Sequence, residues 1–208
     1  MRSLNTLSEA AQQADALIFD CDGTLVDTIP AHLHALQVGF ERIGLNFPAE
    51  WFHQNHSLTA DALLQKFQDD GLGQIEDPKA VLAKHQVLFR ESLHMLEEVS
   101  VIASIAREYK GKLPMAVASN GNRVNVEVSL EAVDLLPYFD AIVAREDVLH
   151  GKPEPDVYLE AAHRLNVAPN RCLVFEDSET GLAAGRAAGA KVIDIREYYQ
   201  PAWQQAGH

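Results

Sequence analysis

The sequence predicts an α/β protein: a Rossmann-like parallel sheet core with an inserted small α-helical cap domain. Two observations carry this prediction. Short apolar runs rich in β-branched or aromatic residues are each followed by a helical stretch, which is typical of a parallel sheet with helices on its faces. This alternation stops after the first run, and the chain from about Pro30 to Leu96 reads as helices only. The length of 208 residues suits a full core with an insertion. We expect the core to comprise residues 1–28 plus 97–208, and the cap residues 29–96.

Five continuously apolar runs are expected to form the strands, because central parallel strands are covered on both faces. They span residues 16–20, 113–118, 141–144, 172–175 and 191–195. Core helices are expected over residues 99–109, 123–133, 155–165 and 178–188, and cap helices over residues 32–43, 58–67 and 79–95, with a turn at 69–73. Cys21 and Cys172 are interpreted as small apolar strand residues, since no CxxC spacing indicates a metal knuckle.

Composition and charge exclude several classes of protein. The 47% hydrophobic and 23% charged residues exclude a disordered or fibrous chain. A balance of 17 basic against 30 acidic residues, a net charge of −13, disfavours a nucleic-acid partner. No apolar run approaches the roughly 18 residues of a membrane span, and residues 1–15 lack the apolar segment of a signal peptide. We therefore expect a cytoplasmic protein that binds no membrane and is a monomer or a weak dimer.

Polar residues follow the first two core runs at the point where ligands bind in open parallel sheets. Asp20 and Asp22 close the first run, and the period of an extended chain points both to the same side. Two carboxylates so close repel each other unless a cation or a shared proton intervenes. Ser119 and Asn120 close the second run, before a helix whose free N–H groups favour an anion.

A lysine and two more acids follow the later runs. Gly151-Lys152-Pro153 supplies one ammonium, and Glu176 and Asp177 close the fourth run. Such hard oxygen ligands suit Mg²⁺, which leaves coordination places for phosphate oxygens and water. An aspartate can attack phosphorus, and phosphoryl transfer chiefly needs positioning and neutralisation of charge. A second aspartate is then free for proton transfer.

Four segments, DCDGTLVDT, VASN, GKPEPDVY and VFEDSETG, resemble in this order the four motifs of the haloacid dehalogenase (HAD) superfamily. The whole arrangement, from residue 16 to about 195, resembles the β-phosphoglucomutase-like branch. The resemblance implies Asp20 as nucleophile and Asp22 as general acid and base, which also gives a backbone carbonyl to Mg²⁺. An aspartate at position 22, where a tyrosine would suggest a dehalogenase, favours phosphoester chemistry.

The same resemblance implies roles for the remaining motif residues. Ser119 and the Asn120 N–H bind phosphate, and Lys152 steadies the nucleophile and the phosphoryl group. Asp177 binds the metal with Glu176 nearby, so that the implied Mg²⁺ site draws on Asp20, Asp22, Asp177 and Glu176. Simpler interpretations exist: Asp20 and Asp22 could form a turn, Ser119 and Asn120 could cap a helix, and Lys152 alone would be a surface charge.

His32 lies at the start of the cap. The mutases and sugar phosphatases that this sequence resembles carry a histidine there that can contact the proton transferred by Asp22. We therefore include His32 among the substrate-binding residues. His34, also in the cap, is interpreted as a structural or exposed residue. The cap further holds His53, His56, His85 and His94, whose spacing forms no convincing zinc pair. We hypothesise that some of them, with Lys84, contribute positive potential.

The cap selects the leaving group in enzymes of this kind. β-Phosphoglucomutase holds a distal phosphate with a cap arginine, and the nearest segment here, residues 55–59, contains no arginine. This difference favours a phosphatase resembling the fructose-1-phosphatase type. We expect Mg²⁺-dependent hydrolysis of a small phosphomonoester, with a sugar phosphate favoured, through an aspartyl-phosphate on Asp20. A phosphomutase and a non-catalytic phosphate-binding regulatory module are the alternatives, and no catalytic position is missing that would favour the latter.

Overall fold

The computed structural model describes residues 3–56 and 58–205. The chain divides into two compact units, which we describe separately: a core unit, formed by the residues up to Asp27 and from Glu97 onward, and a cap unit, Thr28–Leu96. Ser57, part of the segment in which an arginine was sought, lies outside the described residues. Among the described helices, none combines the length and the apolar character that crossing a membrane requires.

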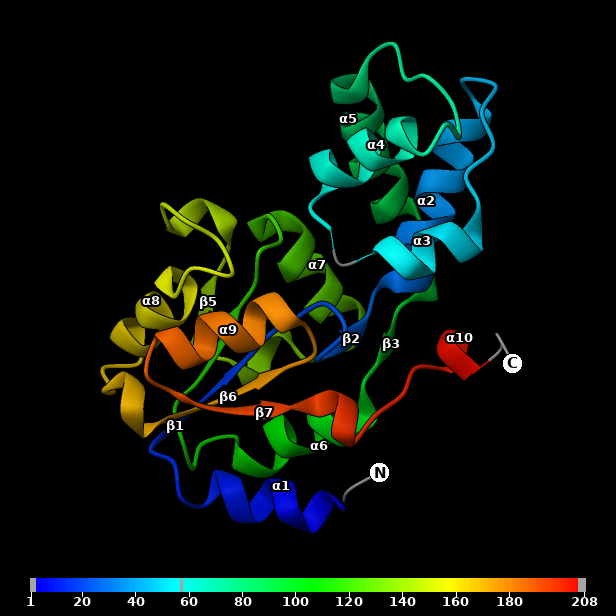
Figure 1. The fold of residues 1–208 in the computed structure, drawn as a ribbon. Coiled ribbons are helices and arrows are strands. Elements are labelled where there is room, and N and C mark those ends of the chain that lie inside the picture. The colour runs from blue at the N-terminus through cyan, green and yellow to red at the C-terminus, as the bar shows by residue number, and fades with distance from the viewer. Residues whose placement is uncertain (1–2, 57, 206–208) are drawn as a thin grey trace. The chain divides into compact units, whose positions relative to one another are not determined.

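A five-stranded parallel sheet in the order β5-β4-β1-β6-β7 forms the centre of the core unit (Figure 1). Its strands are β1 (Ala16–Phe19), β4 (Met115–Ala118), β5 (Ala141–Val143), β6 (Cys172–Glu176) and β7 (Lys191–Asp194). The predicted parallel α/β sheet is confirmed. In register, Phe19 pairs with Val117 of β4 and with Phe175 of β6. The carboxyl ends of β1, β4 and β6 therefore finish side by side.

Helices cover both faces of this sheet, as continuously apolar strands require. The helices of the core unit are α1 (Leu4–Ala11), α6 (Ser100–Tyr109), α7 (Arg123–Ala132), α8 (Asp156–Arg164), α9 (Glu179–Ala187) and α10 (Ala202–Gln205). Ala161 of α8 and Ala184 of α9 pack in one apolar cluster with Ile18 and Val174 of the sheet. Figure 1 places α1 and α6 on the opposite side of the sheet from α9. Single 3₁₀ turns are η2 (Leu136–Tyr138), η3 (Arg145–Asp147), η4 (Pro169–Arg171) and η5 (Ile195–Glu197).

The cap unit consists of helices around an aromatic centre. They are α2 (Ile29–Glu41), α3 (Ala49–Asn55), α4 (Ala60–Asp69), α5 (Pro78–Glu91) and the 3₁₀ turn η1 (Leu93–Met95). The rings of Phe40, Phe47 and Phe67 lie within 5.6 Å of one another, centroid to centroid, and all three side chains are buried. Thr59 and Asp77 begin α4 and α5, because each side chain accepts a backbone N–H of the first turn.

A short antiparallel pair lies where the chain leaves and re-enters the core unit. β2 (Val26–Asp27) pairs with β3 (Glu97–Glu98), and Asp27 lies opposite Glu97. The indole N–H of Trp203 donates to Asp27 Oδ1 at 3.2 Å. The segment that leads to the cap is thus fixed from two sides.

Several elements differ from the sequence-based expectation. Helices α1 and α3 and the β2–β3 pair were not expected, because each is short and offers few buried positions: α1 buries Leu7 and Ala11, and α3 only Phe52. The helix expected over residues 79–95 ends at Glu91, since the hydroxyl of Ser92 donates to the Leu88 carbonyl and the backbone leaves the helix there.

Cys21 is not a strand residue. It is buried in the turn after β1, where its carbonyl accepts the N–H groups of Leu25 and Val26 at 2.9 and 3.0 Å. Cys172, by contrast, is the first residue of β6.

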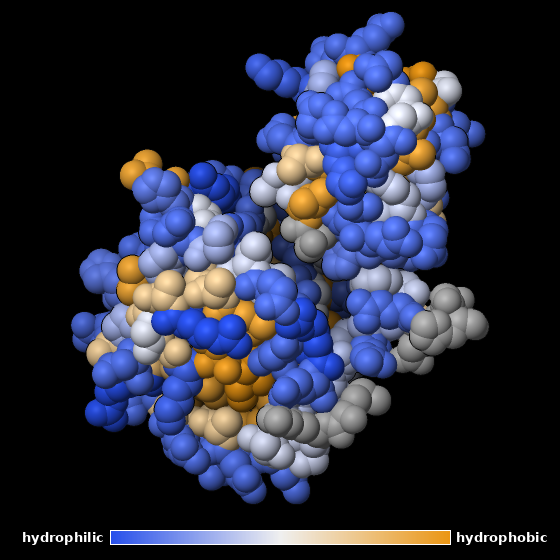
Figure 2. Space-filling model, viewed as in Figure 1, coloured by the Kyte–Doolittle hydropathy of each residue, from blue (hydrophilic) through white to orange (hydrophobic). Residues whose placement is uncertain are grey.

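Figure 2 shows mainly hydrophilic residues on the visible face of the cap unit. An apolar area is visible on the core unit beside α9, towards the sheet edge formed by β7. β7 is the last strand of the sheet, and Val192 and Ile193 in it are only partly buried.

Candidate active site

The turn that follows β1 places Asp20 and Asp22. The Asp20 N–H still donates to the Phe175 carbonyl of β6, so Asp20 is held at the strand end. Gly23 has a φ of +87°, which favours glycine, and its N–H donates to the Val26 carbonyl at 2.8 Å. A Cβ at position 23 would lie 2.3 Å from Asp177 Oδ2. Glycine therefore allows the turn to pass directly over the end of β6.

A buried cation lies between two buried carboxylates. Lys152 Nζ is 2.5 Å from Asp20 Oδ1 and 2.6 Å from Glu176 Oε1, and its side chain is 3% exposed. Burial alone would lower the pKa of Lys152, but these two carboxylates raise it well above its ordinary value, so the amine is an ammonium. Burial raises the pKa of Asp20, the neighbouring carboxylates add to this, and Lys152 opposes it.

The backbone around Lys152 is fixed by the side chain of Asn120. Its Oδ1 accepts the Lys152 N–H at 2.8 Å, and its Nδ2 donates to the Lys152 carbonyl at 3.2 Å. A Cβ at Gly151 would lie 2.6 Å from Asn120 Oδ1, so glycine leaves room for this contact. The sequence interpretation gave Asn120 only a backbone role towards phosphate. The structure adds a side-chain contact that joins the end of β4 to the loop bearing the lysine.

Glu176 accepts four hydrogen bonds. Oε1 accepts from Lys152 and from the Tyr158 hydroxyl, at 2.6 and 3.1 Å, and Oε2 accepts the N–H and the hydroxyl of Ser178, at 2.7 and 3.0 Å. Burial alone would raise the pKa of Glu176, but Lys152 and the groups of Ser178 lower it. A Cβ at Gly181 would lie 1.7 Å from Oε1, so α9 can begin beside this carboxylate only with glycine there.

Asp177 has a different environment from Glu176. Its Oδ1 accepts the hydroxyl of the fully buried Thr24 at 2.9 Å. Burial, reinforced by the charge of Glu176, raises the pKa of Asp177 to about 7. A bound cation would relieve this unfavourable environment for the ionised carboxylate.

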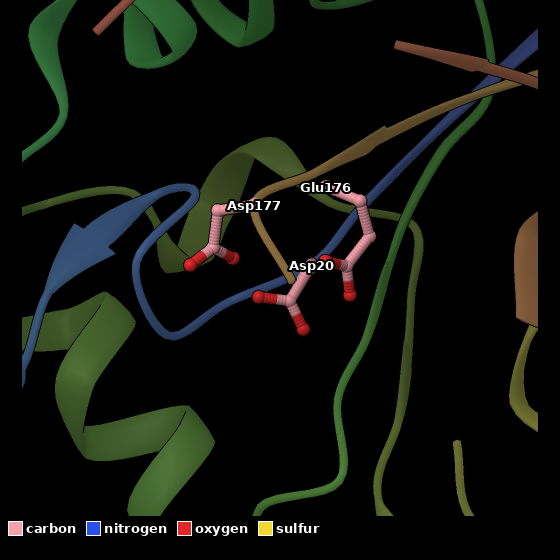
Figure 3. Close-up of side chains that lie close together, drawn as sticks. All are labelled: Asp20, Glu176 and Asp177. Atoms are coloured by element: carbon pink, nitrogen blue, oxygen red, sulfur yellow. The ribbon is translucent and has the colours of Figure 1, made fainter. Parts of the chain in front are cut away.

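Asp20, Glu176 and Asp177 together could hold a metal ion. One carboxylate oxygen from each lies within 4.8 Å of the others. Figure 3 shows the three side chains at the ends of β1 and β6, extending to the same side of the segments that carry them. An all-carboxylate set of this kind is suited to a hard divalent cation.

Ser119 lies at the end of β4 and reaches Asp22. Its side-chain oxygen is 3.3 Å from Asp22 Oδ2 and accepts the Gly121 N–H at 2.9 Å. The residue is 1% exposed. The hydroxyl therefore connects the second aspartate with the loop that precedes α7.

His32 belongs to the cap unit. Its Nδ1 lies 3.2 Å from His85 Nε2, and its ring stacks on Phe89 at 4.2 Å between centroids. Burial lowers the pKa of His32 to about 4, and burial together with His32 lowers that of His85 to about 3. Both rings are therefore neutral near pH 7.

The structure brings together most of the residues that the sequence singled out. One cluster within the core unit contains Asp20, Lys152, Glu176 and Asp177. Asn120 binds the backbone of Lys152, and Ser119 binds Asp22. Sequence reasoning missed Thr24, Tyr158 and Gly181, although all three stand inside the quoted motifs. Their positions in those segments were the available signal.

A family model described as haloacid dehalogenase-like hydrolase matches residues 17–195. The chain belongs to this family, which confirms the resemblance read from the four motifs and the prediction of a hydrolase of this superfamily.

Two curated relatives and a solved structure illustrate the similarity. The chain is 35% identical over 184 residues to fructose-1-phosphate phosphatase YqaB of Escherichia coli, covering 86% of this chain and 95% of that protein. It is 31% identical over 182 residues to the phosphorylated carbohydrates phosphatase of Thermotoga maritima, covering 86% and 83%. A structure from Thermotoga maritima assigned to the β-phosphoglucomutase group aligns with a TM-score of 0.73 and 26% identity, covering 93% of this chain and 91% of that one.

Proposed function

We propose that this protein hydrolyses a small phosphomonoester, with a phosphorylated carbohydrate as the substrate class, through an aspartyl-phosphate on Asp20. The observation that carries the proposal is the buried contact of Lys152 with Asp20 beside the carboxylates of Glu176 and Asp177. A nucleophile, a cation and a metal-binding set in one place meet the needs of phosphoryl transfer, which are positioning and charge neutralisation.

In the first step, a carboxylate oxygen of Asp20 forms a bond to phosphorus and the ester P–O bond breaks. Lys152 holds Oδ1, which leaves the second oxygen of the carboxylate to attack. Asp22, as a carboxylic acid, gives its proton to the departing alkoxide. The products are the free alcohol and a phosphoryl group carried on Asp20.

In the second step, water attacks the phosphorus while Asp22, now a carboxylate, takes a proton from it. The bond between phosphorus and Asp20 breaks, and inorganic phosphate leaves. Asp20 is a carboxylate again and Asp22 again holds its proton. The hydroxyl of Ser119 and the backbone N–H of Asn120 would hold phosphoryl oxygens.

The donor set fits Mg²⁺. Asp20 and Asp177 would hold the ion with the backbone carbonyl of Asp22, while Glu176 already accepts four hydrogen bonds and serves chiefly as the counter-ion of Lys152. When bound, Mg²⁺ supplies positive charge that offsets the negative charge of the phosphoryl oxygens. The raised pKa of Asp177 supports a cation beside it.

Similarity supports the substrate class. Both curated relatives described above are phosphatases of phosphorylated carbohydrates, and the alignments cover most of each chain. We extend this class, without a particular sugar, to the present protein.

Release of inorganic phosphate from a panel of hexose, pentose and hexitol phosphates, with Mg²⁺ or with EDTA, tests the proposal. We expect turnover only with the metal, and none in Asp20→Asn. Asp134→Asn is a matched control, because Asp134 is exposed and its φ of 57° tolerates asparagine. Full activity of Asp20→Asn would show that the nucleophile is misassigned. An inactive wild type on all substrates, including p-nitrophenyl phosphate, would instead favour a phosphate-binding regulatory module.

A phosphomutase is the second candidate, because the aligned Thermotoga maritima structure is assigned to the β-phosphoglucomutase group. A mutase returns the phosphoryl group to sugar instead of to water. Incubation with glucose 1-phosphate and its bisphosphate distinguishes the two: we expect inorganic phosphate, and formation of glucose 6-phosphate without phosphate release would favour the mutase.

A further inference from the structure

Tyr158 contacts both members of the buried ion pair, yet the chemistry above does not use it. It lies in the first turn of α8 and is 1% exposed. Its hydroxyl donates to Glu176 Oε1 at 3.1 Å, and the centre of its ring lies 4.9 Å from Lys152 Nζ. One side chain therefore binds the carboxylate through its polar end and the ammonium through its aromatic face.

The hydroxyl is not needed for packing. Tyr158 belongs to an apolar cluster that includes Ile18, Val143 and Val174. A phenylalanine would fill nearly the same space, and burying a hydroxyl costs free energy unless it finds a partner. Among the described residues, the partners given for this hydroxyl are Glu176, which accepts its hydrogen, and the ammonium of Lys152. The polar end of Tyr158 is thus directed at the ion pair.

Two carboxylates compete for the ammonium of Lys152. Asp20 Oδ1 and Glu176 Oε1 lie at nearly equal distances from Nζ, 2.5 and 2.6 Å. The hydrogen bond that the Tyr158 hydroxyl donates to Glu176 Oε1 offsets part of the negative charge on that oxygen. This weakens the attraction of Glu176 for Lys152 relative to that of Asp20. The ring holds the ammonium from a third side and limits the freedom of the long side chain.

We propose that Tyr158 is a positioning residue that keeps the Lys152 ammonium on the nucleophile Asp20 by moderating the competing pull of Glu176. The effect on turnover rests on the proposed function. The position of the ammonium is a property of the free protein and can be measured without any reaction.

Tyr158→Phe removes the hydroxyl and keeps the ring. Tyr109→Phe is the matched control, because Tyr109 is also a buried tyrosine of the core unit and its hydroxyl donates to the Ser8 carbonyl, away from the ion pair. We would record kcat and KM on p-nitrophenyl phosphate and the ¹⁵N–¹H NMR signal of the Lys152 ammonium, assigned by its absence in Lys152→Arg.

We expect kcat of Tyr158→Phe to fall about two- to tenfold, the range that the net loss of one hydrogen bond corresponds to, with KM nearly unchanged. The Lys152 signal should shift in this variant and stay in place in Tyr109→Phe. A residue that only fills the core would not move this signal.

An unshifted Lys152 signal in Tyr158→Phe would overturn the proposal, as would equal changes in the two variants. In an active wild type, an unaltered kcat of Tyr158→Phe would also overturn it. A wild type without phosphatase activity would refute the proposed function, and the NMR comparison would still decide the role of Tyr158.

Discussion

Replacing Gly181 by alanine is expected to disrupt the ion pair from the far side of Glu176. The added Cβ would lie 1.7 Å from Oε1 and 2.0 Å from Cδ of Glu176, far inside any real contact. The carboxylate must therefore leave its place. In doing so it loses the hydrogen bonds from Ser178, Tyr158 and Lys152.

The magnitude follows from two opposing effects. Alanine is better than glycine in a helix by about 1 kcal/mol. Disrupting a buried ion pair costs about 3–5 kcal/mol, because the remaining charge is left without its partner. We expect Gly181→Ala to reduce the free energy of unfolding by about 2–4 kcal/mol, which lowers Tm by about 5–15 °C for a chain of this size. Lys152 keeps Asp20 but loses the second carboxylate that fixes its position, so kcat should fall about a hundredfold or more.

Gly39→Ala is the matched control. Gly39 lies within α2, and a Cβ there would meet only Leu88 Cδ1 at an ordinary 3.6 Å. This variant should be as stable as the wild type or more stable by up to about 1 kcal/mol, with unchanged activity. Thermal unfolding followed by circular dichroism, together with phosphate release, measures both variants. If Gly181→Ala matched Gly39→Ala in both thermal stability and phosphate release, Glu176 would not occupy the position in which it pairs with Lys152.

Two further predictions concern the metal site and the cap. Thr24→Val removes the hydroxyl that donates a hydrogen bond to Asp177, so the Mg²⁺ concentration for half-maximal activity should rise about 10–100-fold. Thr6→Val, at an exposed threonine, is the control. No change in Thr24→Val, or an equal change in both variants, would contradict this prediction. His85 titrates near 3 when folded against about 6.5 when unfolded, so the unfolded chain takes up a proton first and stability is lost as pH falls through that range. When the pH falls from 7 to 4, the free energy of unfolding of His85→Gln should therefore decrease less than that of the wild type, with a difference of up to about 3 kcal/mol. Equal decreases in the two proteins, measured by denaturant unfolding at both pH values, would refute the burial of this ring.

The parallel sheet could be predicted because its strands carry their own signal. Runs such as residues 172–175 are apolar throughout, and strands covered on both faces need that pattern. Once the strands are known, the rule that ligands bind at their carboxyl ends points to Asp20 and Asp177 without any side-chain geometry. The β2–β3 pair, with two residues in each strand, is too short for any period to be detected.

The contacts within the site could not be predicted in the same way. The bonds between Asn120 and Lys152, and between Tyr158 and Glu176, join residues far apart in the chain. They depend on the distance between loops and on the direction in which a helix presents one side chain, and periodicity carries neither. Gly181 illustrates the same limit, since its need for glycine arises from a side chain on the preceding strand.

The central claim is that Asp20 carries the phosphoryl group in a site completed by Lys152 and Asp177. Rapid quenching during turnover, followed by borohydride reduction and peptide mass spectrometry, tests it most directly, because the reduction converts an aspartyl-phosphate to homoserine. We expect homoserine at position 20 in the wild type and none in Asp20→Asn. Turnover with the modification at another residue, or with none at position 20, would contradict the claim.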